Sequence, residues 1–231
     1  MKDTLRAGLP ALGLALGAEQ TDTLCAFGGA LLEQNRVMNL TAITEPQAVA
    51  QLHFLDCLAL LNALPFAGQS VIDVGCGAGF PGVPLKIAEP SLRLTLLDSL
   101  GKRMAWLAGT LPRLGIEAQC VTARAEEFAA AGREQYGIAV SRAVARLPLL
   151  LELCLPLVRP GGCFAAMKGA GAQAEIGEAK RALAVLGGEV ERIYEYPIAG
   201  ARHCAVVVRK VRPTPPQYPR RYAKIKQRPL L

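Results

Sequence analysis

The chain has 231 residues, of which 52% are hydrophobic and 19% are charged, and its net charge is +7 at pH 7. This length suits one substantial domain rather than two, and the composition excludes a wholly disordered chain. The richest apolar stretch, 147–158, is interrupted by Pro148, Glu152 and Pro156 and is shorter than the roughly 20 residues of a membrane span, so we expect a buried helix there and no membrane partner.

The positive charge is concentrated at the C-terminal end. Residues 201–231 contain nine Lys or Arg and no acidic residue, whereas residues 1–200 carry slightly more acidic than basic groups. A field localised in this way suits a polyanion such as a nucleic acid, and it also occurs in tails that are simply solvated.

The seven cysteines are odd in number and form no C-x-x-C pair. Cys25, Cys57 and Cys154 fall in apolar segments, which favours buried free thiols and a reducing compartment, the cytoplasm. The two histidines, His53 and His203, belong to different regions of the chain, so no metal site is expected.

Residues 1–66 are predicted to form a small helical appendage. Apolar residues recur there at helical spacing in two runs, namely Leu24, Phe27, Leu31, Leu32 and Val49, Leu52, Leu55, Leu58. Thr44 is expected to cap the second helix, with Pro46 in its first turn and Gln47 completing a capping box.

Residues 67–212 are predicted to form one α/β domain. Short β-branched or leucine-rich runs alternate with helical patterns such as 172–186, which indicates a parallel sheet with crossover helices. The predicted strands are 70–74, 93–97, 118–122, 137–141, 163–167, 190–197 and 203–211. The last two are joined by only a few residues around Gly200, so they should pair as an antiparallel hairpin. Seven mostly parallel strands with a terminal antiparallel hairpin favour a Rossmann-like class I methyltransferase sheet over a plain dinucleotide fold.

Residues 213–231 carry interleaved prolines and basic residues and are predicted to be a basic, extended C-terminal tail.

The segment 71–82, VIDVGCGAGFPG, predicts a cofactor site. A buried strand containing Asp73 leads into a glycine-rich turn that begins at Gly75 and then into a helix, which brings backbone to the carboxyl edge of the sheet. A nicotinamide fingerprint needs a small residue at its sixth position, which is Phe80 here. The G-x-G-x-G spacing favours S-adenosylmethionine.

Three later strand ends strengthen this interpretation. Asp98 ends the second strand, at a spacing from Gly75 that suits an acid binding ribose hydroxyls. Residues 122–127 follow the third strand, where this fold contacts adenine, and Arg142 lies at the end of the fourth, next to the expected methyl group.

The methyl acceptor is approached by elimination. The fourth strand is not followed by the D/N-P-P-Y/F turn found beside exocyclic amino acceptors, and no cysteine follows Pro or Thr, as a carbon-5 methyltransferase would require. An acceptor with a free lone pair remains, and guanine N7 is the obvious base atom of that kind.

Several segments together resemble a known family. They are 38–41 (MNLT), 53–56 (HFLD), 75–82, 97–103 (LDSLGKR), 125–128 (AEEF), 141–143 (SRA) and 168–169 (KG). Across nearly the whole chain the sequence is similar to the bacterial small-subunit ribosomal RNA methyltransferase G family, also known as glucose-inhibited division protein B. The resemblance implies methylation of N7 of one guanine in 16S rRNA by S-adenosylmethionine, with the rRNA, the small ribosomal subunit or its precursor as partner.

The resemblance also implies site residues. The cofactor contacts would be Gly75, Phe80, Asp98, Ala125, Glu126 and Arg142, of which Arg142 is also a candidate for positioning the reactants. Candidates for RNA contact are Arg124, Lys168, Arg220, Arg221 and Lys224, although residues 222–225 depart from the family pattern. His53 and Asp56 share a helix face, and we favour a buried His–Asp hydrogen bond over a role at the substrate mouth.

Three alternatives stay open at this point. The chain could be a small-molecule methyltransferase with an incidental basic tail, a non-catalytic protein that binds S-adenosylmethionine or RNA, or a nicotinamide oxidoreductase. Salt-dependent RNA binding, turnover on unmethylated rRNA and a cofactor titration, respectively, would discriminate them.

Overall fold

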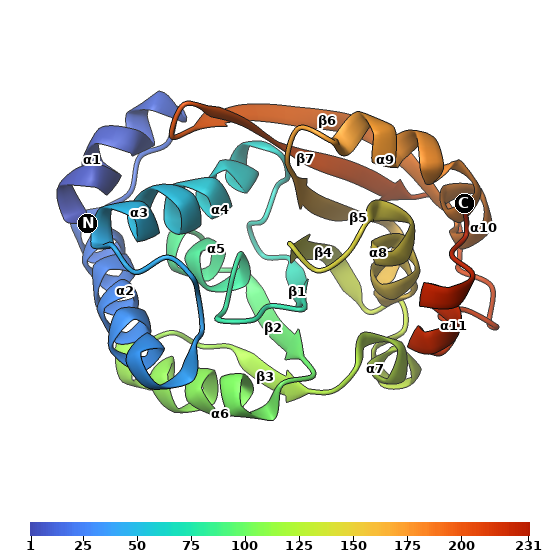
Figure 1. The fold of residues 1–231 in the computed structure, drawn as a ribbon, viewed down its shortest axis with the longest axis horizontal. Coiled ribbons are helices and arrows are strands. Elements are labelled where there is room, and N and C mark those ends of the chain that lie inside the picture. Colours follow the sequence, from blue (N-terminus) through green and yellow to red (C-terminus); the bar gives the residue numbers. More distant parts are fainter.

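A computed structural model describes residues 1–231 and contains one seven-stranded sheet in the order β3-β2-β1-β4-β5-β7-β6 (Figure 1). The strands are β1 Ser70–Val74, β2 Arg93–Asp98, β3 Gln119–Thr122, β4 Tyr136–Arg142, β5 Val158–Lys168, β6 Gly188–Ile198 and β7 Ala201–Lys210. β1 to β5 pair in parallel, and β7 runs antiparallel to both β5 and β6. The chain order reverses between β1 and β4, and ligands bind at such a switch point in open α/β sheets.

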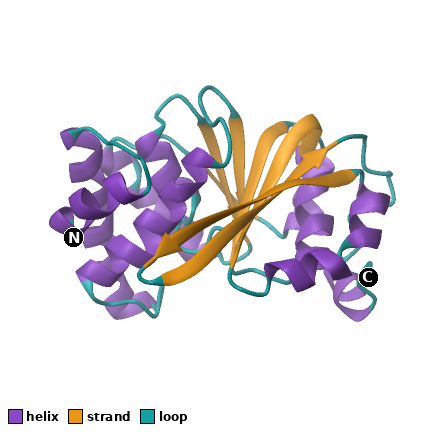
Figure 2. Cartoon of the chain, turned by 90° about the horizontal axis from the view of Figure 1, so that it is seen from above, coloured by secondary structure: helices purple, strands orange, loops and turns teal.

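Helices cover both faces of the sheet, with the N-terminal helices on one side and the C-terminal helices on the other (Figure 2). The helices are α1 Lys2–Ala11, α2 Ala18–Met38, α3 Pro46–Val49, α4 Asp56–Leu58, α5 Gly82–Ala88, α6 Gly101–Thr110, α7 Ala125–Gly132, α8 Leu147–Cys154, α9 Ala172–Glu178, α10 Lys180–Leu186 and α11 Tyr222–Gln227. A π-helical stretch, Ala50–Leu55, joins α3 to α4. No helix is both long enough and apolar enough to span a bilayer.

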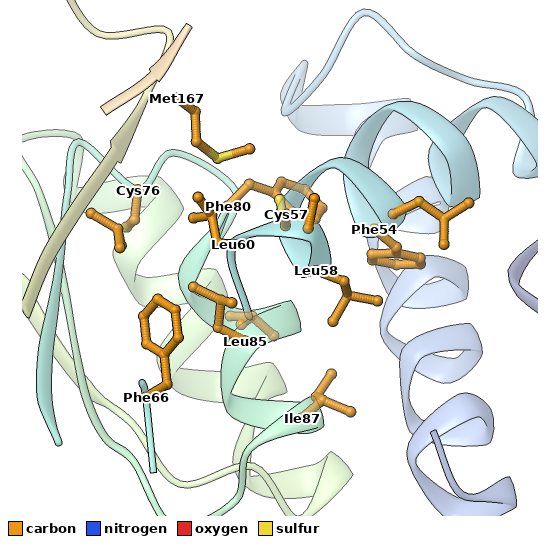
Figure 3. Packing of buried hydrophobic residues seen from close by; sticks show 14 of the residues in the cluster. Phe54, Cys57, Leu58, Leu60, Phe66, Cys76, Phe80, Leu85, Ile87 and Met167 are labelled. Atoms are coloured by element: carbon orange, nitrogen blue, oxygen red, sulfur yellow. The ribbon is translucent and has the colours of Figure 1, made fainter. Parts of the chain in front are cut away.

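Each face of the sheet has its own hydrophobic core because successive side chains of a strand point to opposite faces. In β1, Val71 packs with the N-terminal helices, whereas Ile72 and Val74 pack with α7, α8 and the helices that follow. Figure 3 shows side chains of the first core, among them Phe54 and Leu85, in the space between the N-terminal helices and the sheet.

The predicted sheet is confirmed, including all seven strands and the terminal hairpin. One local prediction is wrong. The helix at Pro46 is preceded by Glu45 as its N-cap, without a side-chain cap bond, so Thr44 is not the cap. The predicted helical stretch 172–186 is confirmed and consists of two short helices, α9 and α10, which meet at Ala179.

The C-terminal segment, residues 213–231, is partly helical and packs against the domain. The prediction of an extended tail is wrong for α11, whose Ile225 is fully buried against the second core. Lys210, the last residue of β7, donates to Leu155 O at 2.5 Å and to Thr214 Oγ1 at 2.6 Å, and it thereby ties the start of this segment to the domain. The prediction of an extended tail was based on the prolines of this segment. The helix α11 forms because its short amphipathic run packs against the domain. The division of the chain at residues 66 and 212 stays a prediction.

Candidate functional site

A cavity of about 370 Å³ opens at the carboxyl ends of β1, β2 and β4, and we call it the cofactor cavity. Its size lies in the range of small-molecule sites. All six predicted cofactor residues line it, namely Gly75, Phe80, Asp98, Ala125, Glu126 and Arg142.

The turn after β1 forms the floor of the cofactor cavity. Gly75 has φ +72°, and a Cβ placed on it would lie 2.4 Å from Val144 Cγ2. Any L side chain would therefore be strained in its backbone and would collide with a neighbour. The amides of Gly75 and Cys76 donate to Leu97 O at 2.8 and 3.2 Å, which fixes the turn against the end of β2.

Asp98 is held at the cavity wall by backbone amides. Its Oδ2 accepts from Gly77 N and its Oδ1 accepts from Leu100 N, both at 2.9 Å. A carboxylate has about four lone-pair positions, so two remain for further hydrogen-bond donors such as hydroxyl groups. The Asp98 carboxylate can therefore still accept hydrogen bonds from ribose hydroxyl groups, as predicted.

Asp73 holds the glycine turn in place from within the protein and does not line the cofactor cavity. It is fully buried, and its Oδ2 accepts from Gly82 N at 2.7 Å while its Oδ1 has no partner. Burial raises the pKa of Asp73 to about 7, although the bond from Gly82 and the charge of Arg142 oppose this shift.

The opposite wall combines the start of α7 with α11. Arg124, Ala125 and Glu126 line it together with Tyr222 of α11. The Cζ atom of Arg124 lies 5.5 Å from the ring centroid of Tyr222, within the range of a cation–π contact. Tyr222 was missed at the sequence level because nearly a hundred residues separate it from Arg124 and no local pattern joins them.

Arg142 lies at the edge of the cofactor cavity in a ring of acceptors. Its Nη1 donates to Leu52 O at 3.0 Å and to Asp56 Oδ2 at 3.1 Å, and its Nη2 lies 2.9 Å from His53 Nδ1. Its Cζ lies 5.1 Å from the ring centroid of Phe80. The guanidinium of Arg142 therefore forms an ion pair with Asp56 and also borders the cofactor cavity, where its contact with the cofactor stays a prediction.

His53 has one tautomer that satisfies its neighbours. Because Arg142 can only donate, His53 Nδ1 accepts, and Nε2–H donates to Thr41 Oγ1 at 2.8 Å. Burial, with the charge of Arg142 as a second cause, lowers the pKa of His53 to about 4, so the ring is neutral at neutral pH. The ring also stacks on Phe80, with centroids 4.5 Å apart.

Asp56 gathers side chains from three distant parts of the chain. Besides Arg142, it accepts from His203 Nδ1 at 2.9 Å and from the Tyr196 hydroxyl at 3.1 Å. The predicted bond between His53 and Asp56 is wrong, because Asp56 pairs with His203 instead. Both histidines meet at the Arg142–Asp56 pair, although their sequence positions suggested separate regions.

The thiols give no activated nucleophile. All seven cysteines are free, and burial raises the pKa of Cys76, which lines the cofactor cavity, well above its ordinary value. Cys57 and Cys154 are fully buried, and their pKa values are raised for the same reason. Thiolate attack on a pyrimidine ring is therefore disfavoured.

The five candidates for RNA contact lie in three places. Arg124 lines the cofactor cavity, and Lys168 Nζ donates to Ala145 O at 2.7 Å and pairs with Glu175 at 2.8 Å. Arg220 pairs with the buried Glu152, whereas Arg221 and Lys224 are exposed beside a surface hollow that Arg220 and Arg228 also line.

Three features of the site fit S-adenosylmethionine: the glycine turn without room for a Cβ atom, the carboxylate at the end of β2, and a cavity of small-molecule size. Together with the order of the strands in the sheet, they define a class I S-adenosylmethionine-dependent methyltransferase. The family model described as rRNA small subunit methyltransferase G matches residues 20–204. The chain belongs to this family, GidB.

Curated relatives support this assignment over full length. A protein of Pelotomaculum thermopropionicum named ribosomal RNA small subunit methyltransferase G is 43% identical, with 100% of this chain and 99% of the relative covered. A protein of the same name from Acetivibrio thermocellus is 42% identical, covering 100% of this chain and 97% of the relative.

Solved structures share the fold. A 16S rRNA (adenine(1408)-N(1))-methyltransferase from Catenulisporales acidiphilia aligns with a TM-score of 0.54 at 17% identity, covering 69% of this chain and 93% of the other. TrmN from Thermus thermophilus aligns with a TM-score of 0.53 at 18% identity, covering 68% and 48%.

Proposed function

We propose that this protein methylates N7 of a guanine in 16S rRNA, with S-adenosylmethionine bound in the cofactor cavity. The observation that carries the proposal is the convergence of all six predicted cofactor residues on one cavity, with Arg142 at its edge. The printed name of the full-length relatives, ribosomal RNA small subunit methyltransferase G, supports the choice of substrate.

The proposed contacts follow from the chemistry of each wall. Gly75 allows close approach of the backbone, and the free lone pairs of Asp98 receive ribose hydroxyl groups. Ala125 and Glu126 border the adenosine end, and Phe80 supplies an apolar surface near the reacting centre. Tyr222 extends this set as a further wall residue.

Bound S-adenosylmethionine supplies an electrophilic methyl group, whose carbon accepts the lone pair of N7 while the sulfur keeps the electrons of the broken C–S bond. Guanine N7 needs no deprotonation, so the chain has to orient the acceptor and exclude water rather than provide a base. This agrees with the neutral, hydrogen-bonded His53 and with the unactivated Cys76 beside the cavity.

Phosphate contact is assigned to Arg124, Lys168 and the C-terminal segment. In that segment, Arg221 and Lys224 are exposed and carry the interaction, whereas Arg220 anchors the segment through Glu152. A guanine N7 within an A-form helix lies in a narrow groove, so the target base belongs to a loop or is turned outward.

We further propose that turnover needs no metal ion and takes place in the cytoplasm. No group of three or more His, Cys, Asp or Glu side chains could hold a metal, and all seven cysteines are free. Activity that survives treatment with a chelator would support the first point.

The deciding experiment is to map 7-methylguanine in 16S rRNA from cells with and without the gene, and to restore it with the purified protein on unmethylated rRNA. Loss of one 7-methylguanine and its restoration would support the proposal. A small-molecule methyltransferase or a non-catalytic binder would leave the rRNA pattern unchanged. Full activity of an Arg142→Ala variant would contradict the role given to Arg142.

A further inference from the structure

A second cavity of about 430 Å³ lies beside the cofactor cavity. The two share His53, Arg142 and Ala143, so the side chains around Arg142 form a common wall. The second cavity opens between the π-helical stretch before α4 and the carboxyl end of β5, where Met167, Lys168 and Gly169 line it. The remaining lining residues are Leu52, Asp56 and His203.

The polar groups at this second cavity are held in place before any ligand arrives. Asp56 is nearly fully buried and accepts hydrogen bonds from Arg142, His203 and Tyr196. Both hydrogens of Arg142 Nη1 and one of Nη2 are engaged by Leu52, Asp56 and His53, which leaves two of its five N–H groups free. Side chains fixed in this way lose little freedom on binding a ligand.

His203 lines the second cavity and has one ring nitrogen with which no group of the chain forms a hydrogen bond. Its Nδ1–H is donated to Asp56, so in the neutral ring Nε2 carries a lone pair, and Nε2 makes no hydrogen bond within the chain. The side chain is 29% exposed, in keeping with a position at the cavity mouth. The cavity is thus lined by His203 of β7, whose neutral ring has an acceptor at Nε2, and by Arg142 of β4, which keeps two free N–H groups.

We infer that this second cavity, the acceptor cavity, holds the guanine base that receives the methyl group, and that Asp56 is a positioning residue acting through Arg142 and His203. This inference rests on the proposed function. Guanine carries an O6 acceptor next to N7, which suits the free N–H groups of Arg142, and N1–H and N2–H donors, which suit His203 Nε2. Adenine has an amino group in place of O6 and no N1–H, so the same arrangement disfavours it.

The first experiment uses the two histidines as reporters, because the chain has only two. Protein labelled on the imidazole carbons is saturated with S-adenosylhomocysteine, which closes the cofactor cavity to nucleotides, and guanosine monophosphate is then titrated by NMR. The His203 resonance, assigned with a His203→Gln variant, should move with guanosine monophosphate and move much less with adenosine monophosphate. Equal shifts with both nucleotides, or no shift at His203, would overturn the inference.

The second experiment separates positioning from cofactor binding. His203→Ala should leave the Kd of S-adenosylhomocysteine unchanged and lower kcat on rRNA by about 10- to 100-fold, since misplaced reactants lose rates of that order. His203→Gln retains one donor and one acceptor and should recover part of kcat. Arg209→Ala is the matched control, because Arg209 lies near the opposite end of the same strand, where its partner in β5 is Cys163.

Wild-type kcat in His203→Ala would also overturn the inference. Failure of the proposed function gives a different result, because the wild-type protein would then form no 7-methylguanine on any rRNA, whereas the NMR shifts do not depend on turnover.

Discussion

Glu152 is fully buried in α8, and Arg220 binds both of its carboxylate oxygens. The Arg220 amide and Nε donate to Oε1 at 2.9 and 2.8 Å, and Nη2 donates to Oε2 at 2.6 Å. This pair fastens the C-terminal segment to the domain, next to the wall that Tyr222 contributes to the cofactor cavity.

Removal of Arg220 should destabilise the fold. Arg220→Ala leaves the Glu152 carboxylate buried without its cation, which costs about 3 kcal/mol of unfolding free energy. Urea denaturation would measure this loss. Arg221→Ala is the matched control, because Arg221 is exposed and its loss should change stability by less than about 0.5 kcal/mol. Equal effects of the two variants would contradict the structural role.

Removal of Lys224 should weaken RNA binding without affecting stability. Lys224 is exposed on α11, and each lost phosphate contact should lower the slope of log K against log salt by about 1. Filter binding of rRNA at several salt concentrations would test this, with Lys86→Ala on the other side of the sheet as control. An unchanged slope in Lys224→Ala would contradict a phosphate contact by Lys224.

Tyr222 should matter for the cofactor. Tyr222→Ala removes an aromatic wall and the partner of Arg124, so the Kd of S-adenosylmethionine should rise about tenfold, while Tyr222→Phe should stay close to wild type. Calorimetric titration without RNA measures this directly. If both variants bind as the wild type does, the Tyr222 ring contributes nothing to cofactor binding.

Gly75 should tolerate no side chain. Gly75→Ala places a methyl group against Val144 in a left-handed backbone and should abolish cofactor binding. Gly109→Ala is the control, because Gly109 lies in α6 with open space around its Cβ position, and alanine there should be neutral or stabilising by about 0.5–1 kcal/mol. Calorimetry of both variants tests the contrast, and measurable affinity in Gly75→Ala would contradict it.

Asp73 should make stability fall as pH rises. Its folded pKa of about 7 lies above the ordinary value of 3.8, so its contribution is fully present below the ordinary value and is lost as the pH rises through 7. Asp73→Asn keeps an acceptor for Gly82 and should flatten this loss. Urea unfolding of both proteins at about pH 5 and about pH 8 gives the change in unfolding free energy with pH for each. His53 contributes in the opposite direction, but equally in both proteins, so its contribution cancels when the two changes are subtracted.

The sheet and the glycine turn could be predicted from sequence because their signals are local. Alternating short strands, the run from Asp73 to Gly82 and the acid at Asp98 each follow from a few neighbouring residues. The structure places all of the predicted cofactor residues on one cavity, since the carboxyl ends of parallel strands share an edge.

The parts that sequence analysis missed depend on contacts between distant segments. The histidines were assigned to separate regions because nothing local to His203 indicates that the hairpin brings it to Asp56. The helix α11 was missed because prolines dominate its surroundings, whereas burial of Ile225 and the Glu152–Arg220 pair stabilise it.

The hydrogen bonds at Asp56 also constrain how the protein folds. Arg142, Tyr196 and His203 lie 86, 140 and 147 positions away from it in the sequence. Loops of such length close late and slowly, after local helices have formed. In a refolding experiment, methyltransferase activity should return only after the circular dichroism signal of helix and strand has recovered. The time course of activity would then report the rate of the last folding step.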